Sequence, residues 1–127
     1  MKIYNVGPKG SGKTPWLMNK AKEESDIGNT VVFLGSVDKF NKLCEYYITT
    51  YHEHCPVQYM KDCNSIPQGA IVLSDNLVDW STRTLVYAVD KRAARWYITL
   101  EGLTDYAPLD HQISMNELME EKNESNT

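Results

Sequence analysis

Short apolar runs alternate with longer amphipathic stretches along most of the chain. Residues 2–6, 30–35, 70–73 and 96–102 form four such runs, rich in β-branched and aromatic residues, and predict four strands. The run at 30–35 ("TVVFLG") is continuously apolar, which is typical of a strand covered by helices on both faces. The chain therefore predicts buried strands of the kind found in α/β proteins.

Between these runs, apolar residues recur at helical spacing and predict helices over 14–26, 37–51 and 77–96. Ser36 is suited to cap the second of them. The positions expected to pack in the core are Val37, Phe40, Leu43, Cys44, Tyr47, Ile48 and Tyr51 in the second helix, and Leu77, Trp80, Thr84, Leu85 and Ala88 in the third. The capping box at 114–117 ("SMNE") opens a short acidic helix that leads into a flexible tail.

Strands that alternate with helices predict a mostly parallel sheet of four or five strands, with helices on both faces in three layers. We expect one domain over residues 1–112, followed by the acidic helix and tail over 113–127. In such a fold, ligands bind at the carboxyl edge of the sheet. The candidate phosphate-binding loop and the candidate acidic residues lie at that edge.

The segment after the first strand, "VGPKGSGKT", matches the phosphate-binding pattern G-x-x-x-x-G-K-[ST] completely. Its glycines allow the backbone N–H groups to wrap around phosphates, Lys13 supplies a charge to the β- and γ-phosphates, and Thr14 suits Mg²⁺. The strand before it and the helix after it are the expected context. We therefore predict a P-loop that binds ATP and Mg²⁺, formed by Gly7, Pro8, Lys9, Gly10, Ser11, Gly12, Lys13 and Thr14.

The net charge of −4 over 127 residues gives the whole protein no attraction for nucleic acid or for an anionic membrane. We expect a cytoplasmic protein, because no apolar run is long enough to span a bilayer and no signal peptide precedes the first strand. Three cysteines without a C-x-x-C pair fit reduced thiols. A zinc site at His52, His54, Cys55 and Cys63 has an unusual spacing, so a helix end followed by a loop is the favoured interpretation.

Beyond the P-loop, the chain resembles the ASCE division of P-loop NTPases, and specifically the viral assembly, DNA-packaging and FtsK/HerA-type ATPases. The resemblance covers roughly residues 1–105 and includes "IPQGAIVLSDN" and "DKRAARWYITLEG". It implies a P-loop NTPase fold and a product of a bacteriophage or mobile element, acting in the host cytoplasm. It also implies that Asp75 holds Mg²⁺ together with Thr14.

The same family usually has a catalytic Glu after this Asp, and here Asn76 occupies that position. An amide cannot accept a proton, so fast hydrolysis requires another acid. Glu101 and Asp105 are the candidate substitutes because they fall on the same edge, and Thr99 is a candidate polar sensor.

The densest basic patch comprises Lys91, Arg92 and Arg95, with Arg92 and Arg95 expected on one helix face. Three interpretations remain open: contacts to nucleic acid, a catalytic finger from Arg95 into a neighbouring subunit's site, or a solvated helix end.

An Mg²⁺-dependent ATPase subunit in phage DNA metabolism or assembly, working as a homo-oligomer or within a larger assembly, is the first functional hypothesis. A nucleotide-dependent regulator that does not hydrolyse is the second. A small nucleoside or nucleotide kinase is the third, since only "KRAAR" imitates the Arg-rich lid of such enzymes.

Overall fold

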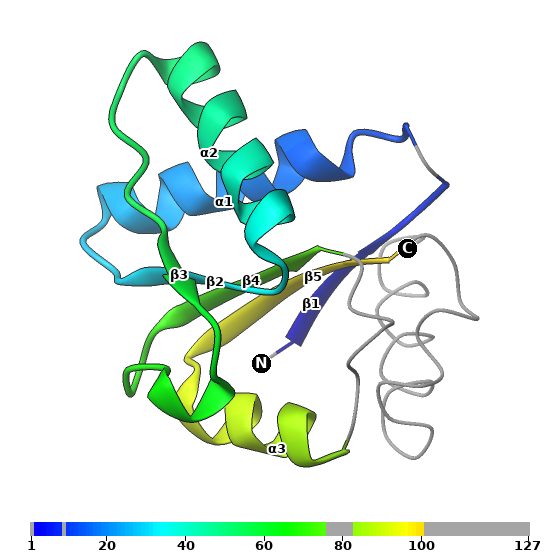
Figure 1. The fold of residues 1–127 in the computed structure, drawn as a ribbon, viewed down its shortest axis with the longest axis vertical. Coiled ribbons are helices and arrows are strands. Elements are labelled where there is room, and N and C mark those ends of the chain that lie inside the picture. Colours follow the sequence, from blue (N-terminus) through cyan, green and yellow to red (C-terminus); the bar gives the residue numbers. More distant parts are fainter. Residues whose placement is uncertain (1, 9, 76–82, 101–127) are drawn as a thin grey trace, which may run out of the picture.

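A computed structural model describes residues 2–8, 10–75 and 83–100, which form a three-layer α/β fold around a five-stranded sheet (Figure 1). The elements in chain order are β1 (Lys2–Val6), α1 (Lys13–Asp26), β2 (Val31–Leu34), α2 (Val37–Tyr51), β3 (Gln58–Met60), the 3-10 helix η1 (Cys63–Ser65), β4 (Ile71–Asp75), α3 (Arg83–Arg92) and β5 (Arg95–Leu100).

All five strands are parallel, in the order β1-β5-β4-β2-β3. β5 therefore lies between the P-loop strand β1 and the acidic strand β4, with Val6 opposite Leu100 and Asp75 opposite Thr99. Because the strands are parallel, their carboxyl ends share one edge. The fold confirms the predicted α/β class and puts the P-loop and Asp75 on the same edge.

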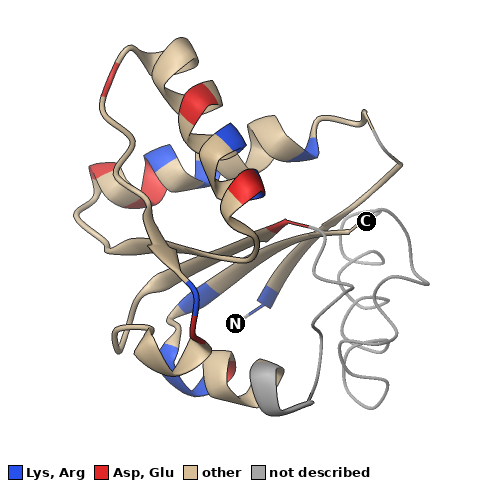
Figure 2. Ribbon diagram, viewed as in Figure 1, with Lys and Arg blue, Asp and Glu red and all other residues tan. Residues whose placement is uncertain are grey.

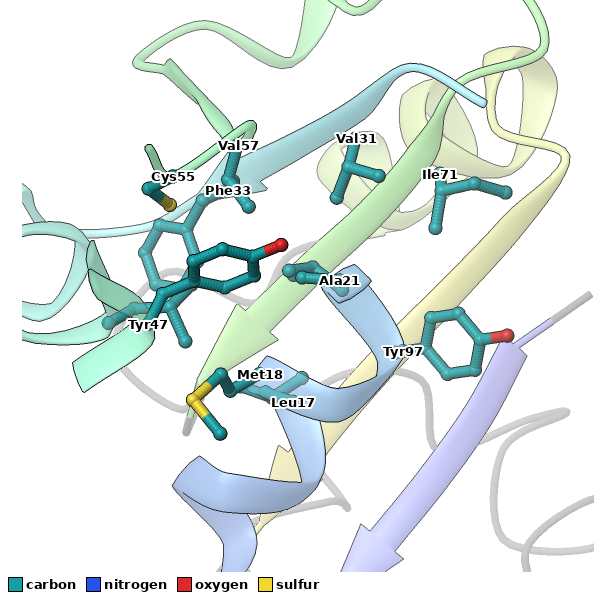
Figure 3. Close-up of a cluster of buried hydrophobic side chains, with 12 residues drawn as sticks. Leu17, Met18, Ala21, Val31, Phe33, Tyr47, Cys55, Val57, Ile71 and Tyr97 are labelled. Carbon is teal, nitrogen blue, oxygen red and sulfur yellow. The ribbon is translucent and has the colours of Figure 1, made fainter. Parts of the chain in front are cut away.

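The three central strands β2, β4 and β5 are buried on both faces, as continuous apolar runs predict, whereas the edge strand β1 is half-buried. On one face, α1 and α2 cover the sheet. Leu17 and Ala21 of α1 and Tyr47 of α2 pack in one buried cluster with Phe33 of β2, and Figure 3 shows these side chains pointing toward one another. On the other face lie α3 and η1 (Figure 1). The buried residues of that second cluster are Val32, Leu34, Ile66, Ala70, Val72, Val86, Val89, Trp96, Ile98 and Leu100.

Edge strand β3 was not predicted, since the sequence favoured a loop from the end of α2 to Asn64. β3 has only three residues, half-buried or exposed, and a single neighbour, β2. Its pairing depends on partners 26 positions earlier in the chain, with Val32 opposite Gln58, which a local pattern cannot indicate.

Predicted core positions in two helices were partly wrong. In α2, Leu43 and Tyr47 are buried, but Val37 and Ile48 are 52% and 48% exposed. Among the α3 side chains that the structure describes, Val86 and Val89 are buried and Ala88 is half-buried, whereas the side chains of Thr84 and Leu85 lie outside the description. Leu77 and Trp80 lie outside the described residues, and so do the predicted acidic helix and tail.

The third helix ends at Arg92, four residues before its predicted end at residue 96. The Arg92 carbonyl accepts a hydrogen bond from Gly69 N (2.7 Å), and Ala94 N donates to the Ala70 carbonyl (2.9 Å). These hydrogen bonds to the turn before β4 end the helix, and the chain continues as β5 from Arg95 onward. None of the helices in the described ranges has the length and apolar character needed to cross a bilayer.

Candidate functional site

The predicted phosphate loop follows β1 directly and leads into α1. Gly7 N donates to the Leu100 carbonyl (3.0 Å), which fixes the start of the loop to β5. Gly10 and Gly12 have φ of 85° and 89°, a left-handed conformation that favours glycine. The backbone of this loop thus favours glycine at Gly12, a fixed position of the motif, and at Gly10, a variable one. Lys9 lies outside the described residues.

The amino end of α1 carries no side-chain cap. Gly12 occupies the N-cap position without a side-chain hydrogen bond, and the first turn contains no acidic residue. Helix N-termini carry unpaired N–H groups and a partial positive charge, which favour an anion. Pro15 in the first turn removes one N–H that would otherwise need a partner. The end of the loop is therefore electrostatically suited to phosphate.

Lys13 is buried at the base of the loop, with 9% of its surface exposed. Its Nζ donates to the carbonyl oxygens of Gly7 (2.6 Å) and Pro8 (2.8 Å). Within the described ranges, no carboxylate lies within ion-pair distance of this ammonium group. A buried cation whose partners are neutral carbonyls is poised to bind an anion, because charged acceptors form the stronger hydrogen bonds.

Asp75 ends β4 at the same edge of the sheet. The hydroxyl of Thr99, which is fully buried in the neighbouring strand, donates to Asp75 Oδ1 (2.6 Å). Thr99 thus holds the carboxylate in place, and its role as a polar sensor stays a prediction. Asn76, Glu101 and Asp105 lie outside the described residues.

A cavity of about 600 Å³ lies between the loop, Asp75 and the start of α2. It is lined by Gly10, Gly12 and residues 13–15 on one side, and by Asp75, Lys39 and Lys42 on the other. The two lysines of α2 were missed by the sequence reasoning. Because α2 begins just after β2, the rule that carboxyl ends of parallel strands share one edge could have identified them.

The residues of this cavity fit Mg²⁺. Thr14 and Asp75 both line it, and hydroxyl and carboxylate oxygens are ligands of the hard type that this ion prefers. In the described part of the chain, no group of three or more His, Cys, Asp or Glu side chains could hold a metal. One carboxylate still suits Mg²⁺, which is commonly bound by one or two carboxylates together with substrate phosphates and water.

The candidate zinc residues do not come together. Cys55 packs in the cluster beneath α1 and α2, whereas Cys63 packs against the cluster on the α3 face. The sheet separates them. His52 ends α2 with φ of 56° and is exposed.

The prediction that Arg92 and Arg95 share a helix face was wrong. Arg92 ends α3, whereas Arg95 begins β5 at the amino edge, opposite the edge that carries the P-loop. Its Nε and Nη2 donate to the two carboxylate oxygens of Glu24 (2.6 and 2.7 Å). The guanidinium thus holds the end of α1 against β5.

Glu24 is the centre of this amino-edge cluster, with only 3% of its surface exposed. It also accepts hydrogen bonds from the Tyr97 hydroxyl (2.8 Å) and Asn29 Nδ2 (3.1 Å). The Arg95 hydrogen bonds, and then those from Tyr97 and Asn29, hold the pKa of the Glu24 carboxyl below its ordinary value against the opposing effect of burial. Burial and the adjacent Glu24 raise the pKa of Tyr97 to about 12.

Because the pKa of Glu24 is lowered in the folded state, its charge stabilises the fold above the ordinary carboxyl pKa of 4.5. This contribution is lost as the pH falls below that value and through the lowered pKa. We expect Glu24→Gln to reduce the free energy of unfolding at pH 7 and to flatten its decline in acid. Urea denaturation between pH 7 and pH 3 measures both effects, and Glu23→Gln, at an exposed site on the same helix, is the control. An unchanged acid decline in Glu24→Gln would contradict the role of the cluster.

Chemically, the carboxyl-edge cavity combines loop and helix N–H groups, a buried ammonium group, a hydroxyl and a carboxylate. These are the donors and ligands needed to hold a polyphosphate with a divalent cation. Comparisons of the chain with models of known protein families, with curated proteins and with solved structures gave no match.

Proposed function

We propose that the protein binds MgATP in the carboxyl-edge cavity. The observation that carries this proposal is the buried ammonium group of Lys13, which rests on two loop carbonyls and belongs to a residue that lines the same cavity as Asp75. The backbone N–H groups of Gly10, Gly12 and the first residues of α1 hold the phosphates, since Gly7 N is bonded to the Leu100 carbonyl and Pro8 has no N–H. Thr14 and Asp75 hold Mg²⁺, which neutralises phosphate charge when bound.

Each side chain has a distinct part in this binding. The Lys13 ammonium leaves the Gly7 and Pro8 carbonyls for phosphate oxygens, exchanging neutral acceptors for charged ones. Thr99 is a positioning residue, since its hydroxyl fixes Oδ1 of Asp75 from the buried strand β5. Binding therefore requires little rearrangement of the sheet edge.

We further propose that the protein is a slow ATPase subunit acting in DNA metabolism or assembly, alone as a homo-oligomer or within a larger complex. Support comes from the P-loop together with the acidic strand, as in the ATPases that the sequence resembles. Asn76 in place of the family's Glu favours a second candidate, a nucleotide-dependent regulator without turnover. A nucleic-acid partner would contact Lys91 and Arg92 at the amino edge, where Arg95 is held by Glu24.

Release of γ-phosphate from ATP, with and without DNA, tests turnover. We expect a slow release that Lys13→Ala abolishes and that Asn76→Glu raises, because a carboxylate can orient and deprotonate the attacking water. A contaminating ATPase would survive Lys13→Ala, which makes this variant the internal control. MgATP binding without any Lys13-dependent release would instead support the regulator.

A further inference from the structure

We infer that Lys39 binds the terminal phosphate of the nucleoside triphosphate, with Lys42 in support, so that the cavity selects triphosphate over diphosphate. Since this role requires a nucleotide in the cavity, it rests on the proposed function. Neither lysine belongs to the phosphate-loop motif.

The fold fixes Lys39 at the opposite wall of the cavity from Lys13. Strand β2 lies next to β4, and α2 begins just beyond β2, where the Ser36 hydroxyl accepts a hydrogen bond from Lys39 N (3.3 Å). The Lys39 side chain then reaches over β4, and its Nζ donates to the Asp75 carbonyl oxygen (3.1 Å). Its ammonium group is thus held at the end of the acidic strand.

The charge of the cavity wall points to an anionic ligand. Three lysines and one carboxylate line the cavity, although the chain as a whole has a net charge of −4. Figure 2 shows a basic position at the start of α1, and basic positions in the first turns of α2 next to one acidic position, Asp38. Lys13 alone would only offset Asp75, so Lys39 and Lys42 give the cavity its excess of positive charge. A nucleoside triphosphate keeps a net negative charge even when Mg²⁺ is bound, which this excess complements.

The position of Asp75 indicates which phosphate Lys39 meets. In phosphoryl-transfer sites the cation bridges the β- and γ-phosphates. Thr14 and Asp75 line the same cavity and would hold the cation, so a γ-phosphate beyond the loop would lie near Asp75. Lys39 Nζ is already at Asp75, on a neutral carbonyl that it can exchange for a phosphate oxygen. A diphosphate would fill the loop and leave Lys39 without a phosphate partner.

The test compares the dissociation constants of MgATP and MgADP for the wild type and for Lys39→Met, Lys39→Arg and Lys42→Met. We expect Lys39→Met to weaken MgATP binding by about tenfold and to leave MgADP binding nearly unchanged, since one charge-assisted hydrogen bond is lost. Lys39→Arg should restore most of the preference for triphosphate. Lys42→Met should have a smaller effect because Lys42 is exposed and solvent-screened.

Lys61→Met is the matched control. Lys61 directly follows β3 and does not line the cavity. Lys61→Met therefore removes an exposed positive charge from the same edge of the sheet without changing the cavity lining. An equal loss of MgATP and MgADP affinity in Lys39→Met, or the same loss of triphosphate preference in Lys61→Met, would overturn the role of Lys39 while leaving the proposed function intact. If the wild type binds neither MgATP nor MgADP, the proposed function fails and the inference fails with it.

Discussion

Lys13→Ala is expected to abolish the stabilisation that MgATP gives to the folded protein. At a ligand concentration a hundredfold above the dissociation constant, binding to the native state alone adds about 2.7 kcal/mol to the free energy of unfolding. For a domain of this size, that corresponds to a rise in melting temperature of about 10 °C. The variant loses the effect because its loop has no buried ammonium group to meet the phosphates.

The measurement is the melting temperature of each protein with and without MgATP, so that each variant serves as its own reference. This matters because Lys13 also bonds two loop carbonyls, and its removal alters the ligand-free protein as well. Lys20→Ala is the control variant: Lys20 lies on the same helix and pairs with Glu23 (3.3 Å), away from the cavity. Equal increases in melting temperature for Lys13→Ala and wild type would remove the phosphate-loop interpretation.

Much of the fold could be predicted from local patterns. The apolar runs identified β2, β4 and β5 because a strand buried on both faces is largely apolar, whereas β1, half-buried throughout, was identified by its position directly before the loop motif. Ser36 was correctly predicted to cap α2, since capping involves only residues within one turn. The phosphate-loop motif could be identified for the same reason, since its glycines and Lys13 are close together in the sequence.

Features that depend on distant contacts could not be predicted in this way. β3 forms by pairing with the edge of β2. α3 ends at Arg92, whose carbonyl accepts a hydrogen bond from Gly69 N in the turn before β4. The shared carboxyl edge could have identified Lys39 as a candidate, but its contact with Asp75 depends on β2 lying next to β4, which the order of strands along the chain does not reveal. Likewise, the partner of Arg95 is Glu24, 71 residues earlier.

This partnership makes Arg95 a structural residue in the second prediction. We expect Arg95→Ala to lower the free energy of unfolding by about 2–3 kcal/mol, because it leaves the buried Glu24 carboxylate without its cation. The value lies at the lower end for a buried pair, since 36% of the Arg95 side chain is exposed and water screens part of the interaction.

Urea denaturation at pH 7 measures this loss, with Lys91→Ala and Arg92→Ala as controls from the same basic patch. Lys91 is exposed, so its removal should change the free energy of unfolding by less than about 0.5 kcal/mol.

The controls also separate stability from nucleic-acid binding. A patch that binds DNA loses affinity in all three variants, with a salt dependence that becomes shallower for each charge removed. If only Arg95→Ala weakens DNA binding, and the loss of DNA affinity follows the fraction of unfolded protein, then Arg95 affects DNA binding only by stabilising the fold. Unchanged stability in Arg95→Ala would instead show that the ion pair with Glu24 does not hold α1 to β5.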